Sequence, residues 1–500
     1  MYQLFSITLQ VISGKNKITI MKDEKKKAQE GTENNEKKIR QTGSLRERLS
    51  RVKRTRWIRF GIVSVIFFAW VIWLGNWWVA LAWFLLADIY LTQFIPWNWW
   101  KFSDNKILHT VMSWVDAIVY ALVLVYFLFI FVGQNYQIPS SSLEKTLLTG
   151  DFLWVNKMVY GPRVPQTPLH FPLAQNELFG CKSYIEHPQL DYHRLKGVRN
   201  VERGDIVVFN FPAGDTVCVD LPNPDYYTQV FEDGRDAVWA NHEVIYRPVD
   251  RRDNYVKRCV GLPGETLKIV NGVVNINGKD IPEPKNVQYN YAVKINGNGP
   301  DYDFLTNELG IANEDIERNV AVDPMSGQQF ISPELYLPLT AEMKAKLEKC
   351  NWVTSVTRAQ YGAAEGVRTY PLGVDYGWTH NDYGPIWIPK KGASIDLNEK
   401  NLQLYARCIK NYEGANLEIK GGKAYIDGKP AAKYTFKMDY YWMMGDNRDN
   451  SLDSRFWGFV PEDHIVGTPM FVIVSFDKDR TWTDGKVRWN RVFIDANPDK

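Results

Sequence analysis

The sequence has few of the residues that hold metal ions or disulfide bridges. Its 500 residues include only seven histidines and five cysteines. The cysteines form no Cys-x-x-Cys pair and no Cys/His ligand spacing, so we predict no metal site. No close pair suggests a disulfide, and the odd number leaves at least one free thiol in a monomer. The five are Cys181, Cys218, Cys259, Cys350 and Cys408.

The chain also lacks an excess of charge of either sign. Lysine and arginine number 60 against 57 aspartates and glutamates, which gives a net charge of +3. A nearly neutral chain has no general attraction for a polyanion, so we predict no nucleic-acid partner. The length alone allows two to four domains.

Residues 1–56 contain little that could build a core. Residues 1–20 are mildly apolar, but the run is short and no small-residue cleavage site follows, which argues against a signal peptide. From Met21 the chain is lysine-rich and polar, as expected of a disordered or loosely helical segment. We therefore expect 1–56 to be a basic cytoplasmic N-terminus, and we expect Met21 to be the true start.

Three apolar segments follow, at residues 57–74, 77–95 and 113–132. Each is about long enough to cross a hydrocarbon core of ~30 Å, so we predict a membrane region over 57–133. Asp88 and Asp116 fall inside or at the rim of these segments. A carboxylate at mid-bilayer is costly, so each should face another helix or lie near an end.

Basic residues before the first segment predict the orientation of the chain. Positive charge favours the cytoplasmic side, which puts the N-terminus inside. Three crossings then place everything after the third segment outside, at the periplasmic face. The third segment alone would give the same result, whereas two crossings would not. The basic residues are Arg51, Lys53, Arg54, Arg56 and Arg59.

Residues 134–500 have the pattern of a mainly β domain with antiparallel sheets. Short runs of β-forming residues at 152–155, 205–211, 267–276 and 469–476 are separated by Gly, Pro and Asn-Gly turns. A helical pattern covers 340–348. Three stretches rich in Tyr, Pro, Asn and Asp interrupt the pattern as insertions of unassigned function. They cover about 161–200, 213–252 and 285–410.

A serine-rich stretch begins just after the third apolar segment. Ser140, Ser141 and Ser142 follow a proline, and residues 136–151 contain neither histidine nor cysteine. A serine hydroxyl is a poor nucleophile unless a base removes its proton, so a base must come from elsewhere in the chain. His464 is near a later motif, but a surface or turn role suits it better than catalysis.

Lys257 is the candidate base. A lysine acts as a base only when neutral, and burial lowers the pKa of an amine by as much as ~3–5 units. In a strand, Tyr255, Lys257 and Cys259 share one face, so Lys257 can point inward while Arg258 points to the other side. Taken alone, a lysine that extends its ammonium to solvent is the more frequent case.

Four stretches, in this order and behind an apolar segment, resemble the conserved boxes of the bacterial type I signal peptidases (leader peptidases). These are membrane-bound serine proteases with a Ser–Lys dyad. The first box, Pro-Ser-x-Ser-Met-x-Pro-Thr-Leu in the family, is similar to residues 139–147. Here Leu143 replaces the methionine and keeps an apolar anchor, while Lys145 replaces the proline and loosens the backbone. The other boxes match residues 203–209, 255–264 and 445–455.

The resemblance implies a role for each matching residue. Ser142 corresponds to the nucleophile and Lys257 to the general base. The Ser140 hydroxyl and the Ser142 backbone N–H would form the oxyanion hole. Ser451 would orient the lysine amine. An ion pair between Asp453 and Arg455, together with Arg258 and Asp446, would support the site.

The implied function is removal of N-terminal signal peptides from exported preproteins at the outer face of the cytoplasmic membrane. No metal and no organic cofactor is implied. Ile138, Leu143 and Val256 would line shallow pockets for small side chains near the cleavage site. Two alternatives stay open: another Ser/Lys protease, such as a repressor-type self-cleaving enzyme, and an inactive membrane scaffold with the same fold.

Overall fold

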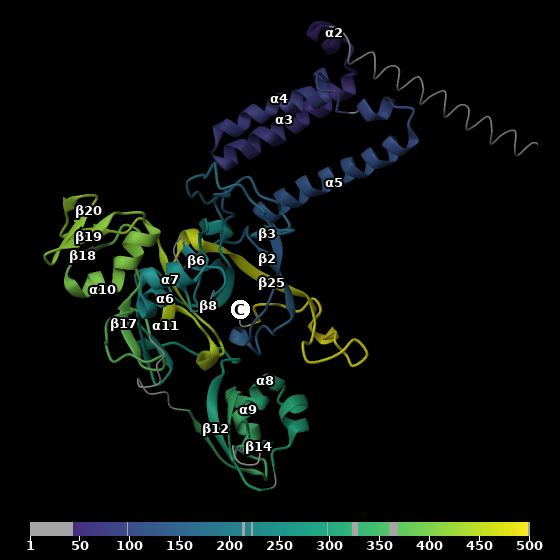
Figure 1. Ribbon diagram of the computed structural model, residues 1–500. Coiled ribbons are helices and arrows are strands. Elements are labelled where there is room, and N and C mark those ends of the chain that lie inside the picture. The colour runs from purple at the N-terminus through teal and green to yellow at the C-terminus, as the bar shows by residue number, and fades with distance from the viewer. Residues whose placement is uncertain are drawn as a thin grey trace, which may run out of the picture. The chain divides into compact units, whose positions relative to one another are not determined.

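The computed structural model describes residues 44–498 apart from 98, 213–215, 222–223, 298, 323–328 and 360–368. The expected disorder of the N-terminus and the choice of Met21 therefore lie largely outside the described residues. The chain divides into two compact units, one ending at Leu124 and the other running from Val125 (Figure 1).

The first unit contains a helical hairpin. Helix α3 (Arg54–Leu74) begins three residues before the predicted segment and ends at Gly75, whose φ of 70° reverses the chain. The returning segment Trp77–Thr92 packs against α3, and Trp83 Nε1 donates to Ser64 Oγ at 2.9 Å. This segment comprises η1 (Trp77–Ala82), α4 (Trp83–Ala87) and η2 (Asp88–Thr92).

Two helices in the described part of the chain are long and apolar enough to cross a membrane: α3 and α5 (Lys106–Phe131). The segment between them is a shorter apolar helix. Asp88 lies in its last turn, where its carboxylate accepts hydrogen bonds from the backbone of Phe94 and Ile95 and from the Trp97 indole. It therefore lies near a segment end, one of the two positions that the sequence allowed.

The second unit is built on a seven-stranded sheet in which every neighbouring pair of strands is antiparallel. The predicted mainly β fold is thus confirmed, and strands occur at each of the four predicted runs. In spatial order the strands are β1 (Gly133–Gln137), β2 (Asp151–Asn156), β25 (Ile465–Ser475), β5 (Ile206–Asn210), β8 (Asn254–Gly261), β23 (Tyr440–Met444) and β24 (Val460–Pro461).

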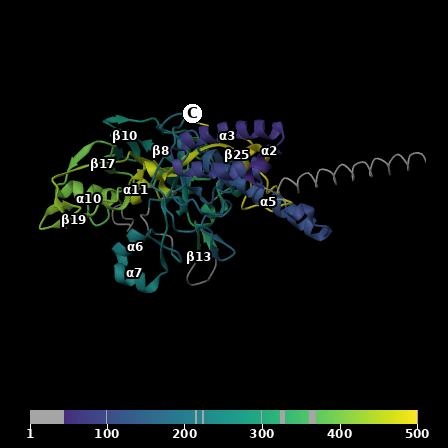
Figure 2. The same ribbon diagram turned by 90° about the horizontal axis from the view of Figure 1, so that it is seen from above.

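The three strands that follow β8 in the chain belong to a second, four-stranded sheet. It consists of β11 (Lys279–Asp280), β10 (Val273–Ile276), β9 (Thr266–Val270) and β17 (Tyr383–Trp387). Its apolar face shares one core with helix α10 (Glu399–Arg407), through residues such as Leu267, Ile386 and Tyr405. Figures 1 and 2 both show β17, α10 and β19 (Leu417–Lys420) lying together.

The predicted insertion at 285–410 has two parts. Its first part forms a separate three-stranded sheet of β15 (Glu334–Leu339), β12 (Tyr289–Ile295) and β16 (Val353–Arg358), with its own core. The predicted helix is confirmed as α9 (Ala341–Leu347), which Thr340 caps through its side chain. Its second part supplies strand β17 to the sheet that contains β9, and helix α10 to the hydrophobic core beneath that sheet.

Candidate active site

The serine-rich stretch forms a tight turn between β1 and β2. Residues Ser141–Leu143 make one 3-10 turn, and the side chains of Leu143 and Leu147 are fully buried in the core beneath it. The backbone N–H of Asn447 donates to the Ser142 carbonyl at 3.1 Å, and its side-chain amide donates to the Ser141 carbonyl at 3.2 Å. Asn447 therefore holds two consecutive carbonyls of the turn in place.

Lys257 and Ser142 are in direct contact. Lys257 lies on strand β8, between β5 and β23 in the sheet and opposite Val207 of β5, and its Nζ is 2.5 Å from Ser142 Oγ. The two residues are only 4% and 6% exposed. Burial lowers the pKa of Lys257 to about 8, against an opposing effect of the nearby carboxylates of Asp453 and Asp446. A substantial fraction of this amine is therefore neutral near pH 8.

Ser140 lies beside Ser142 and is more exposed than it. Its Oγ is 3.4 Å from Ser142 Oγ, and the residue is exposed. A hydroxyl at this place can donate to an oxygen that develops charge beside the attacked carbon.

Ser451 lies against the same turn but makes no hydrogen bond to the lysine. It is 5% exposed, and among the described residues its Oγ has no hydrogen-bond partner. A Cβ added to Gly445 would come within 2.2 Å of Ser451 Oγ and 2.6 Å of the Ser142 carbonyl oxygen. Only glycine fits at position 445, because Ser451 and the nucleophile turn both press against it.

Arg258 points to the opposite side of β8 from Lys257, as alternation predicts, but it is also buried. Its guanidinium makes a bidentate ion pair with Asp446, at 2.8 Å for both bonds, and donates to the Gly204 carbonyl at 2.9 Å. Thr146 Oγ1 donates to the same carboxylate at 2.7 Å. This network joins the turn that carries Ser142 to β8 and to the chain segments next to β5 and β23, so it holds these parts of the site together.

Asp453 and Arg455 form the expected ion pair. Arg455 Nε and Nη2 bind the Asp453 carboxylate at 2.8 Å each, and the backbone N–H of Gly445 donates to it at 3.1 Å. Both side chains are buried, and Arg455 and the hydrogen bonds lower the pKa of Asp453 against desolvation. The carboxylate stays ionised and orders the loop that carries Ser451.

Sequence reasoning gave no role to Thr146, Gly445 or Asn447. All three lie inside the matched boxes at 139–147 and 445–455, so the signal was present. Their roles depend on contacts between segments about 300 residues apart, which spacing within one box does not predict.

A cavity of about 350 Å³ opens beside Ser142. Ile138 and Val256 line it as expected, whereas Leu143 does not: its side chain is part of the core. The expected place of Leu143 was wrong, because the 3-10 turn rotates it inward. Further apolar residues in the lining are Leu153, Val208, Tyr255 and Leu452.

His464 is buried elsewhere and has a structural role. Its Nδ1 lies 2.6 Å from the Asp463 carboxylate, and Arg252 donates to its Nε2 at 2.8 Å. Desolvation lowers its pKa, and it does not line the cavity at Ser142. The interpretation that it is not catalytic agrees with this geometry.

Comparison with known proteins gives one consistent result. The sequence family described as signal peptidase, peptidase S26, matches residues 111–339 and 388–474. Signal peptidase I of Buchnera aphidicola subsp. Baizongia pistaciae is 25% identical over 417 residues, which cover 82% of this chain and 91% of that protein. Signal peptidase I of Helicobacter pylori strain 26695 is 24% identical over 395 residues, covering 76% of this chain and 90% of that protein.

A third relative, signal peptidase I of Haemophilus influenzae, is 22% identical over 392 residues, which cover 76% of this chain and 74% of that protein. The family match spans well over half of the chain. Its one internal gap, residues 340–387, includes β17 of the second sheet. The chain belongs to the signal peptidase family, peptidase S26.

Proposed function

We propose that this signal peptidase cleaves exported preproteins with Ser142 as nucleophile and Lys257 as general base. The observation that carries the assignment is the 2.5 Å contact between Lys257 Nζ and Ser142 Oγ, in a site where both groups are buried. A base must be within hydrogen-bond reach of the proton that it removes and must have a pKa near the working pH. Lys257 meets both conditions.

The reaction has two balanced steps. The neutral Lys257 amine takes the Ser142 proton while Oγ attacks the scissile carbonyl, and the resulting ammonium returns a proton to the departing amine. This leaves an ester on Ser142. Lys257 then takes a proton from water as the hydroxide attacks the ester carbonyl. The ester bond to Oγ breaks, the Lys257 ammonium returns its proton to Oγ, and the signal peptide leaves with its new carboxylate.

We assign the oxyanion hole to the Ser140 hydroxyl and the Ser142 backbone N–H. The position of Ser140 Oγ, 3.4 Å from the nucleophile oxygen, supports this. We assign Ser451, Arg258, Asp446, Asp453 and Arg455 to positioning. The four charged residues pair with one another and bind the backbone and Thr146, and Ser451 packs against Gly445 beside the turn that carries Ser142. The apolar cavity of about 350 Å³ suits small side chains next to the cleaved bond.

We propose further that the chain crosses the cytoplasmic membrane three times, with its N-terminus inside and residues 134–500 outside. The basic residues before α3 support the orientation. A catalytic unit outside the membrane meets the cleavage sites of exported preproteins as they emerge, and the apolar part of a signal peptide stays in the bilayer.

The test is cleavage of a synthetic preprotein by the detergent-solubilised chain. Ser142→Ala and Lys257→Met should each lower kcat by about 10³-fold or more, because neither leaves an activated nucleophile. Methionine keeps the length of the lysine stem, and Lys268→Met, at an exposed lysine of β9, is the matched control that should keep full activity.

The outcomes separate the alternatives. Activity that persists in Lys257→Met shows that another group is the base. Self-cleavage without preprotein cleavage favours a different Ser/Lys protease, and an inert wild type that no lactam acylates at Ser142 favours the scaffold.

A further inference from the structure

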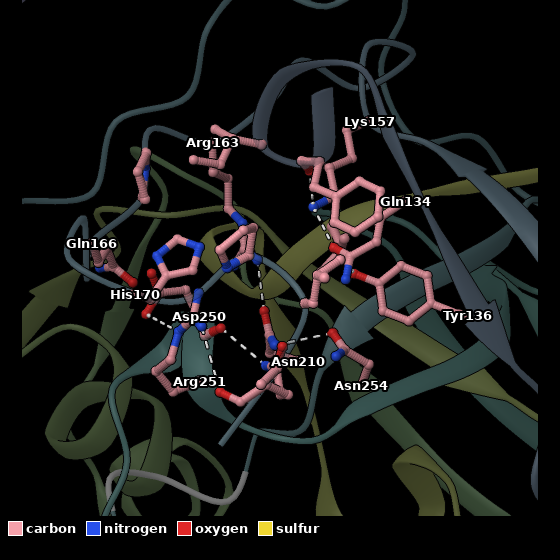
Figure 3. A pocket seen from close by; sticks show the side chains of 18 of the residues that line it. Gln134, Tyr136, Lys157, Arg163, Gln166, His170, Asn210, Asp250, Arg251 and Asn254 are labelled. Atoms are coloured by element: carbon pink, nitrogen blue, oxygen red, sulfur yellow. Dashed lines mark hydrogen bonds and ion pairs between the residues drawn. The ribbon is translucent and has the colours of Figure 1, made fainter. Parts of the chain in front are cut away.

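A second, larger cavity of about 620 Å³ lies next to the active-site cavity. Tyr136, Gln137 and Asn254 line both cavities, so β1 and the start of β8 separate them. The residues drawn in Figure 3 place Lys157 and Gln134 on one side, with His170, Asp250 and Arg251 opposite. The mechanism proposed above uses none of these five.

The lining carries more positive than negative charge. Lys157, Arg163 and Arg251 face a single carboxylate, Asp250, among the described residues that line the cavity. That carboxylate is already engaged: it accepts from the backbone N–H and the hydroxyl of Thr167, at 2.9 and 2.8 Å. Arg251 Nε is 3.8 Å from it. Asp250 thus pairs with Arg251. It acts on Lys157 and Arg163 only from beyond ion-pair distance, as Asp463 does on Arg163, so neither of these two cations has a carboxylate in direct contact among the described residues.

Arg163 and Lys157 each have more N–H groups than the hydrogen bonds that they donate. Arg163 donates to the Asp463 carbonyl and to Asn210 Oδ1, although a guanidinium has five N–H groups. Lys157 donates to the Phe129 carbonyl and to Gln134 Oε1, although an ammonium has three. Both are bonded to neutral oxygens, which do not balance their charge.

The surroundings disfavour these charges. Desolvation lowers the pKa of Lys157 to about 7 and that of Arg163 to about 10. His170 Nδ1 donates to the Thr167 carbonyl at 2.8 Å, and burial lowers the pKa of His170 to about 4, so it adds no charge at neutral pH. An anion in the cavity would relieve the cost of burying the two cations.

The walls of the cavity point to the source of that anion. Phe129 and Ile130, in the last turn of α5, form one wall, and residues 163–175 of the first insertion form another. Tyr126 of α5 holds this insertion by donating to the Pro168 carbonyl at 2.6 Å. Because α5 is apolar and long enough to span a bilayer, its end marks the level of the lipid headgroups.

We propose that this cavity binds a phosphate group, and that its source is the headgroup of an anionic phospholipid. Guanidinium and ammonium groups are the usual partners of phosphate oxygens. The first insertion thereby gains a function: it closes a phosphate site where the last apolar helix ends, one strand away from the nucleophile.

The test is binding to the full-length Ser142→Ala chain in a maltoside detergent, where cleavage plays no part. The probes are dihexanoylphosphatidylglycerol, inorganic phosphate and dihexanoylglycerol, which has the same chains but no phosphate. We expect saturable binding of the phospholipid, weakened about tenfold or more by Arg163→Gln. Lys182→Gln removes a charge of the same insertion that is outside the cavity lining, and should leave binding unchanged.

A second variant guards against misfolding. Gln166→Glu places a carboxylate in the lining without removing a cation, and the bond from Leu190 N–H to the Gln166 backbone carbonyl is retained. It should weaken phospholipid binding as strongly as Arg163→Gln, at an unchanged thermal midpoint.

Each outcome decides the proposal. Binding of the phospholipid but not of inorganic phosphate supports a lipid headgroup. Binding of both, lost in both variants, supports the phosphate site with a soluble source. Equal binding of dihexanoylglycerol, or binding that neither variant weakens, overturns the proposal and leaves the catalytic assignment untouched.

Discussion

The pKa of Lys257 depends on the buried surroundings of its amine. Water is excluded around its amine, while Asp446 and Asp453 lie close enough to favour the charged form. Desolvation is the larger effect and lowers the pKa from 10.5 to about 8. Below about pH 8 the folded state bears the whole cost of a buried ammonium. The free energy of unfolding should therefore gain a contribution as pH rises from 8 towards 10.5.

The same shift predicts the pH dependence of cleavage. The base works only when neutral, so kcat/KM should rise about tenfold per pH unit below the pKa and level off above about pH 8. The measurement is kcat/KM for preprotein cleavage between pH 6 and 10.

Lys157 is a second lysine with a lowered pKa, about 7, so the inflection of the pH profile could come from either lysine. Lys157→Gln is the control that separates them. The inflection should stay at the same pH in Lys157→Gln, whatever the rate of that variant. A profile that is flat across this range, or an inflection that disappears in Lys157→Gln, would contradict the assignment of Lys257.

At the scale of single residues, the sequence was enough to propose Ser142 and Lys257 as the reacting pair, because the boxes keep the residue types that the chemistry needs. It did not predict the contacts that hold them. The buried face of Arg258 and the pairing of Thr146 with Asp446 depend on how strands from distant parts of the chain come together. Local alternation places a side chain on a face but does not say what covers that face.

At the scale of elements, β1 is polar and gave no signal, but β2, β5 and β25 of the main sheet were predictable because each contains a short apolar run. The division of the 285–410 insertion was not. Its strand β12 pairs with β15 on one side and with β16 on the other, whereas β17 pairs with β9, more than 100 residues earlier. Sequence patterns identify strands, but partner choice depends on long-range packing.

The insertion also contacts the nucleophile turn, and this gives a reason for the replacement of proline by Lys145. The backbone of Lys145 has a φ of 69°, which proline cannot adopt because its ring fixes φ near −65°. The Lys145 ammonium donates to the carbonyls of Leu309 and Gly310, at 2.9 and 2.5 Å. The turn at Ser142 is thus tied to the loop that precedes α8 (Asn313–Glu317).

Restoring the family's proline should therefore impair this particular enzyme. Lys145→Pro forces a backbone change worth about 1–3 kcal/mol, and we expect kcat to fall about tenfold or more while KM changes little. Lys145→Gly accepts the positive φ and loses only the side-chain bonds, so its loss should be smaller. Equal activity of wild type and Lys145→Pro would show that the turn does not need this conformation.

At the scale of the whole chain, the number of membrane crossings decides which side Ser142 is on. The segment Trp77–Thr92 is shorter than its neighbours, and at 1.5 Å per residue it spans only about 24 Å. Its packing nevertheless extends along α3. Arg48, which precedes α3, donates to the Gln93 carbonyl at 3.1 Å and lies over the Phe94 ring. The returning segment therefore ends beside the start of α3, and if α3 crosses the bilayer the segment crosses it too.

This argument predicts opposite sides for the two ends of the chain. With an epitope tag at the N-terminus and a second tag inserted at Gly180, beside the exposed Phe179, protease added to intact spheroplasts should remove only the second tag. The N-terminal tag should be lost only after lysis. Deletion of residues 77–92 leaves two crossings, which by parity brings both tags to the same side. If both tags of the undeleted chain are cleaved before lysis, or neither is, then the hairpin does not cross twice and the three-crossing topology fails.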